Sequence, residues 1–103
     1  MTDAFKISTM QNSAERVVGI LKSLANTDRL IILCHIAQKE LNVAQIEELT
    51  GIHQPTLSQQ LMMLRKGDIV STRRAGKQIY YRLKDQNLQI ILNTLHDLYC
   101  SKT

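Results

Sequence analysis

The chain has 103 residues, of which 44% are hydrophobic and 21% charged, and its formal net charge is +4. This length predicts one domain around one core, and the composition excludes a disordered chain. The longest apolar run, Leu30–Cys34, is far shorter than the roughly 20 residues of a membrane span, and residues 1–10 lack the features of a signal peptide. We therefore expect a cytoplasmic protein with reduced cysteines.

The domain boundaries follow from where periodic patterns begin and end. We expect a flexible N-terminal segment over residues 1–10, one folded domain over residues 11–100 and a C-terminal tail over residues 101–103. The sequence contains no repeat and no low-complexity stretch.

Two helices are predicted in the first third of the chain. Asn12 and Glu15 resemble a capping box, and apolar residues at helical spacing follow, so the first helix is expected over Ser13–Leu24. Asn26 can cap a second helix. Its apolar run, Leu30–Ile36, is too continuous for a surface helix and is expected in the core.

A pair of short helices is predicted next. The third helix is expected over about Val43–Thr50, with Ile46 and Leu49 facing inward, and Gly51 can turn the chain at its end. Pro55 suits the first turn of a fourth helix because the N–H that proline lacks has no partner there. This helix should run to Gly67, and its buried side is marked by Leu57, Leu61 and Leu64.

The last third of the chain predicts a β-hairpin and a final helix. Two strand-like segments, Ile69–Arg73 and Gln78–Leu83, flank a turn at Ala75–Lys77. Asp85 can cap a helix with apolar residues at spacings of three and four, namely Leu88, Ile91, Leu92, Leu95, Leu98 and Tyr99. The chain is therefore predicted to be mainly α-helical with one small hairpin.

Positive charge is concentrated in one segment. Residues 53–84 hold seven Lys and Arg residues against one acidic residue, Asp68, whereas the rest of the chain has a net negative charge. A contiguous basic third indicates an anionic polymer as the partner.

Two short helices joined through Gly51 and followed by a basic hairpin are typical of a winged helix-turn-helix that binds double-stranded DNA. We predict that the polar face of the fourth helix meets base edges in the major groove; its residues are Gln54, Thr56, Ser58 and Gln59. The hairpin is predicted to contact phosphates or the minor groove through Arg73, Arg74 and Lys77.

Three segments make the chain similar to the ArsR/SmtB family of transcriptional repressors. They are Asp28–Leu33, Gln54–Leu61 and Arg73–Leu83 with its Tyr80-Tyr81 pair. The resemblance extends from the first helix to Cys100, and it implies a homodimer through the first and last helices. It also implies binding to an imperfect inverted repeat and a response to an inducer. The abundance of apolar residues in these two helices agrees with a dimer, although a core within one subunit is the alternative.

The metal sites that are common in this family are not matched. The stretch that would carry two thiolates reads Glu40-Leu41-Asn42-Val43-Ala44-Gln45, and the last helix offers Asp85, Asn87, His96 and Asp97 at other spacings. The three histidines, His35, His53 and His96, are dispersed along the chain. We expect neither a metal site nor a cofactor.

Cys34 and Cys100 remain as candidate sensing residues. The sequence pattern by itself favours a buried, inert Cys34 and a tail thiol at Cys100, because the two are far apart and form no CxxC motif. The chain resembles the BigR/SqrR-like persulfide sensors of the family, which have a cysteine pair in these two helices. That resemblance implies a repressor whose cysteines become linked by reactive sulfur species.

Other functions are left open by the sequence. A peroxide-sensing or metal-sensing thiol repressor, or a constitutive DNA-binding module with incidental cysteines, would share the same fold. An enzyme such as a dithiol reductase is disfavoured, because the chain lacks a CxxC motif, a phosphate-binding glycine loop and an acid, base and nucleophile set.

Overall fold

The computed structural model describes residues 6–100, which form five helices and three short strands. The helices are α1 (Ile7–Leu24), α2 (Thr27–Gln38), α3 (Val43–Thr50), α4 (Thr56–Lys66) and α5 (Gln86–Tyr99). The strands are β1 (Leu41–Asn42), β2 (Val70–Ala75) and β3 (Gln78–Leu83), in the antiparallel order β1-β3-β2. This is the predicted winged helix-turn-helix architecture. None of the described helices is long and apolar enough to cross a membrane.

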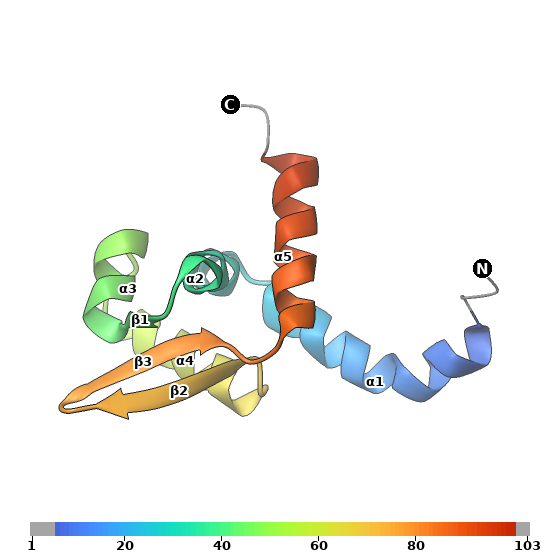
Figure 1. Cartoon of the computed structure of the whole chain (residues 1–103), viewed down its shortest axis with the longest axis horizontal. Coiled ribbons are helices and arrows are strands. Elements are labelled where there is room, and N and C mark those ends of the chain that lie inside the picture. The colour runs from blue at the N-terminus through green and yellow to red at the C-terminus, as the bar shows by residue number, and fades with distance from the viewer. Residues whose placement is uncertain (1–5, 101–103) are drawn as a thin grey trace.

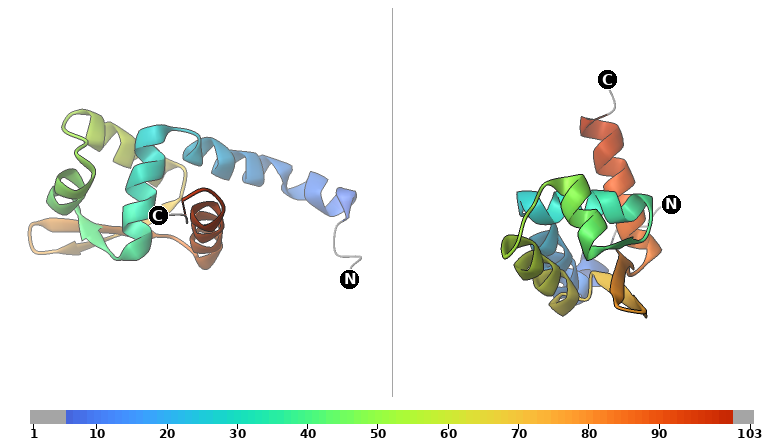
Figure 2. Two further views of the ribbon diagram at one scale, coloured as in Figure 1. Left: turned by 90° about the horizontal axis from the view of Figure 1, so that it is seen from above. Right: turned by 90° about the vertical axis from the view of Figure 1, so that its left-hand side faces the viewer.

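The core lies around α2, between the α3–α4 pair and the base of the sheet (Figure 1). The largest fully buried side chains come from α2, α3 and α4, namely Ile32, Leu33, Ile46, Leu57 and Leu64. Each such side chain contributes about 1.5 to 3 kcal/mol through burial. α1 and α5 extend away from this body, and the hairpin extends on the side opposite to α1 (Figure 2).

Capping residues mark where α2 and α5 begin and where α3 ends. The side chain of Asn26 accepts a hydrogen bond from the Arg29 backbone N–H at 3.0 Å, and Asp85 accepts one from the Leu88 N–H at 3.2 Å. Gly51 ends α3 with φ of 74°, a conformation that glycine adopts without strain. These three predicted helix boundaries are thus confirmed, and Gly51 turns the chain from α3 toward α4.

The predicted start of the first helix is wrong. α1 begins at Ile7 and not at Ser13, because Ile7 and Met10 continue the helical apolar spacing upstream of Asn12. Residues 1–5 of the segment expected to be flexible, and the tail over residues 101–103, lie outside the described residues.

Leu49 does not face inward. It is 54% exposed because α3 turns Val43, Ile46 and Thr50 toward the body, and Leu49 lies off that face. The apolar run of α2 is likewise not wholly in the core, since Ile31 and Cys34 are exposed. A helix turns a continuous apolar run through every direction, so some of its residues face outward.

The sequence analysis missed strand β1. Leu41 pairs with Tyr81 and Asn42 with Tyr80, so β1 adds a third strand to the hairpin. Asn42 also caps α3 through a capping box with Gln45, in which both hydrogen bonds measure 2.9 Å. Two residues are too few to show the alternation that identifies a strand. β1 ties the wing to the start of the helix-turn-helix.

Candidate DNA-binding surface and cysteine pair

The predicted base-reading residues lie together at the start of α4. Gln54, Ser58 and Gln59 are exposed and Thr56 is half-buried, while the three leucines on the opposite side of the helix are all buried, as predicted. The side-chain oxygen of Gln54 accepts a hydrogen bond from the Ser58 backbone N–H at 3.0 Å. Gln54 therefore also caps this helix, whose N-cap Pro55 has no side chain able to do so.

Arg29 holds α4 in place, a role that the sequence analysis did not assign. Its guanidinium donates to the side-chain oxygen of Gln60 in α4 at 3.1 Å. It also donates to the backbone carbonyls of Ser23 at 2.8 Å and Lys22 at 3.0 Å. Arg29 thus joins the end of α1 to the middle of α4. Its guanidinium is a charged donor, and hydrogen bonds from a charged donor are stronger than those between neutral groups. The side chain lies in the Asp28–Leu33 segment that carried part of the family resemblance.

The wing presents its basic residues on two different faces. Strand residues two apart share a face, so Arg74, which pairs with Ile79, lies on the same face as Thr72 and Tyr81. That face packs toward α4 at the base of the hairpin. Lys77 lies in the turn beside Gly76, whose φ is 63°. Both Arg74 and Lys77 are exposed, as a phosphate contact requires.

Arg73 lies on the opposite face and is bound within the protein. Its Nη2 is 2.6 Å from Oε1 of Glu40, its Nε is 3.1 Å from both carboxylate oxygens, and its guanidinium is 4.7 Å from the centre of the Tyr80 ring. The hydrogen bond from Arg73 holds the pKa of the Glu40 carboxyl below its usual value. Arg73 therefore ties the wing to β1, and its charge is already paired with an acid.

Cys34 lies on α2 where that helix contacts α5, and Cys100 follows the end of α5 as its C-cap residue. Both are free and exposed, so Cys34 is not the buried side chain that the sequence pattern favoured. Cys34 lines a hollow of about 250 Å³ whose α5 side is formed by Leu92, Asn93, His96 and Asp97. Partial burial raises the pKa of the Cys34 thiol, and the nearby charge of Cys100 raises it further. The fold therefore places Cys100 near enough for its charge to act on Cys34, although the two are 66 positions apart in the sequence.

The residues considered as metal ligands are not gathered into one site. Among residues 6–100, no group of three or more His, Cys, Asp and Glu side chains could hold a metal ion. His53 instead lies 3.1 Å from Glu47, and both side chains flank the turn between α3 and α4.

Comparisons with known proteins agree with the fold. Residues 26–72 match the family described as bacterial regulatory protein, arsR family. The biofilm growth-associated repressor of Xylella fastidiosa is 41% identical over 90% of this chain and 82% of its own length. The relative of the same name in Agrobacterium fabrum is also 41% identical, over 92% of this chain and 81% of its own length.

A solved structure of the repressor BigR from Xylella fastidiosa has a TM-score of 0.88 at 39% identity, and the match covers 95% of this chain and all of that one. HlyU from Vibrio cholerae, at 34% identity, has a TM-score of 0.84 and covers 89% of this chain and all of its own. The chain therefore belongs to the arsR family of bacterial regulatory proteins, as a winged helix-turn-helix transcriptional regulator similar to BigR and not an enzyme.

Proposed function

We propose that this protein is a homodimeric repressor that binds an inverted-repeat operator while Cys34 and Cys100 are reduced. Reactive sulfur species, such as persulfides and polysulfides, link the two thiols, and operator binding is then lost or altered. The observation that carries this proposal is that both thiols are exposed, and that Cys34, at the α2–α5 contact, lies near enough to Cys100 for the charge of one to act on the other.

The chemistry needs an attacking thiolate and a second thiol within reach. One thiolate attacks the outer sulfur of a persulfide RSSH, RS⁻ leaves, and a protein persulfide forms. The second thiolate attacks the inner sulfur of that group, HS⁻ leaves, and a disulfide remains. When a second persulfide donates before closure, an extra sulfur stays in the bridge.

The dimer is proposed to form through α1 and α5. In the single chain, large apolar side chains are exposed on both helices, namely Ile7, Met10, Val18 and Leu21 on α1 and Ile90, Leu95, Leu98 and Tyr99 on α5. Large apolar side chains exposed in this number favour an interface with another subunit. A bridge between α2 and α5 would shift α5, and with it the distance between the two α4 helices, which must match half-sites about one DNA turn apart.

Intact-protein mass spectrometry of the anaerobically reduced protein tests the sensing chemistry. After exposure to an organic persulfide, we expect Cys34 and Cys100 to be joined in one cross-linked peptide, with a mass gain of whole sulfur atoms where the bridge retains them. Hydrogen peroxide, run in parallel, should react little. Absence of any persulfide product, or a plain disulfide from peroxide alone, would contradict persulfide sensing and leave a different inducer to be found.

The recognition helix and the wing should respond differently to substitution. Arg74→Ala should weaken binding to every DNA sequence and make the salt dependence shallower, because a phosphate contact is lost. Gln59→Ala should weaken binding to the operator by about 1 to 3 kcal/mol and leave random DNA unaffected, because a base contact is lost. Fluorescence anisotropy on both duplexes measures the two effects. Equal losses on both duplexes for both variants would refute this division.

A further inference from the structure

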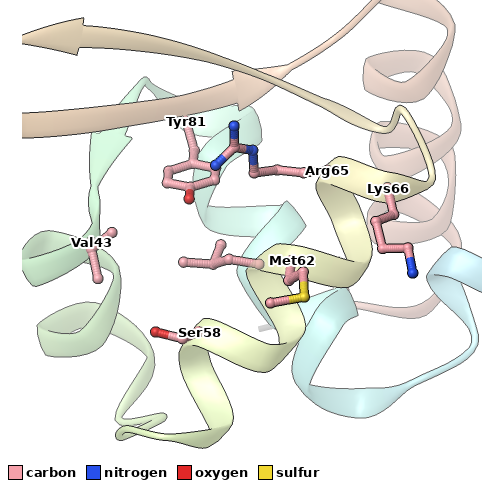
Figure 3. A pocket seen from close by; sticks show the side chains of 7 residues that line it. Val43, Ser58, Met62, Arg65, Lys66 and Tyr81 are labelled. Atoms are coloured by element: carbon pink, nitrogen blue, oxygen red, sulfur yellow. The ribbon is translucent and has the colours of Figure 1, made fainter.

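A hollow of about 370 Å³ lies between α4 and the sheet (Figure 3). Ser58, Met62, Arg65 and Lys66 line it from α4, and Tyr81 lines it from β3. The side chain of Arg65 reaches from α4 toward the ring of Tyr81 (Figure 3). The sequence analysis placed its phosphate contacts on the hairpin tip and assigned nothing to this hollow.

The position of the hollow matters because of the shape of DNA. The two grooves of a duplex are separated by a sugar-phosphate strand. A protein that places a helix in the major groove and a hairpin in the adjacent minor groove must therefore have that strand between them. In this protein, the space between the helix and the hairpin is the hollow of Ser58, Arg65 and Tyr81.

The charges around the hollow are available to a ligand. Among the ion pairs of the described residues, Arg73 is paired with Glu40 and Lys84 with Asp68, whereas neither Arg65 nor Lys66 takes part in one. Both residues are exposed in the last turn of α4. The wing face that borders the hollow is also the face that carries Arg74. The hollow thus combines unpaired positive charge, two hydroxyl groups and an apolar floor.

We propose that this hollow is the binding site for the sugar-phosphate strand that separates the two grooves. Arg65 and Lys66 contact successive phosphates, the hydroxyl of Tyr81 donates to a phosphate oxygen, and Met62 packs on deoxyribose. The inference rests on the proposed DNA binding. It adds a backbone clamp between the base-reading residues and the wing tip, and it would fix the register of α4 without reading sequence.

Salt dependence on a random-sequence duplex gives the first test, because it needs only nonspecific binding. Arg65→Gln and Lys66→Gln should each make the slope of log affinity against log salt concentration shallower. The expected change is about 0.9 for each bound subunit, the value for one lost phosphate contact. Arg65→Lys should keep most of the slope. Lys39→Gln, which removes the same charge from a different hollow between α2 and α3, should leave it unchanged.

The second test locates the contact on the DNA. A duplex selected from a random library by the reduced wild-type protein is made with single neutral methylphosphonates at successive positions. The wild type should lose affinity at one or two phosphates between the protected major groove and the wing-contacted minor groove. Arg65→Gln should be insensitive at that same position and remain sensitive elsewhere.

The outcomes separate this inference from the proposed function. Slopes of both Gln variants equal to that of Lys39→Gln, or a methylphosphonate pattern unchanged in Arg65→Gln, would overturn the backbone site while leaving operator binding intact. Failure of the wild type to select any sequence would overturn the proposed operator binding, and the salt slopes would still decide the backbone site.

Discussion

Cys34→Ser and Cys100→Ser should each bind operator DNA as tightly as the reduced wild type and fail to respond to persulfide. The wild type should lose about 5- to 150-fold in affinity after the same treatment, the range of a typical allosteric coupling. Serine is close to cysteine in size and both positions are exposed, so the fold should be retained. The missing sulfur prevents the bridge between α2 and α5. Anisotropy titrations before and after treatment measure the effect.

Asn93→Ala is the matched control for the cysteine variants. Asn93 lines the same hollow as Cys34 but has no sulfur, so this variant should respond as the wild type does. A cysteine variant that still releases DNA after persulfide treatment would exclude the two-thiol mechanism. Loss of the response in Asn93→Ala would instead indicate that the shape of the hollow, and not the bridge, carries the signal.

Leu98→Glu should convert the proposed dimer into monomers. Leu98 is 68% exposed in the single chain, on the outer side of α5, and a carboxylate there would have to be desolvated in a dimer interface. Operator affinity should fall by about 10³-fold, toward the nonspecific level, because one subunit can occupy only one half-site. Sedimentation velocity and anisotropy measure the two consequences.

Gln89→Glu introduces the same charge on the inner flank of the same helix and should remain dimeric. Gln89 hydrogen-bonds to Asn93 at 3.1 Å, on the side of α5 that faces away from the outer apolar stripe. A Leu98→Glu protein that sediments as a dimer with full operator affinity would refute the assignment of α5 to the interface.

Much of the fold could be predicted from the sequence, because the residues that start and end helices and the residues that form the core indicate the same elements. Asn26, Gly51 and Asp85 mark helix ends through chemistry that acts within four residues, and the leucines of α4 show an unambiguous helical period. The prediction that Leu49 faces inward was wrong, and it shows how little the spacing of apolar residues determines in a short helix. Eight residues allow more than one apolar face, and only tertiary packing chooses between them.

Some of the candidate site residues could be predicted from the sequence, and others could not. The exposed polar start of α4 and the basic turn of the wing could be predicted from residue type and order. The pairing of Arg73 with Glu40 could not, because it joins residues 33 positions apart across β1, a strand too short to recognise. The binding of Arg29 to Gln60 of α4 depends in the same way on contacts distant in the sequence.

In the proposed function, α5 performs two tasks on separate faces of the same helix. Asn93, His96 and Asp97 face the hollow of Cys34, whereas Leu95 and Leu98 lie on the outer apolar side. Substitutions on the inner side can therefore alter which chemical signal is detected without altering how subunits recognise each other. The proposed DNA-contacting surface, on α4 and the wing, is built from other elements. With such a division, the inducer of a regulator can change during evolution while its operator and its dimer interface stay the same.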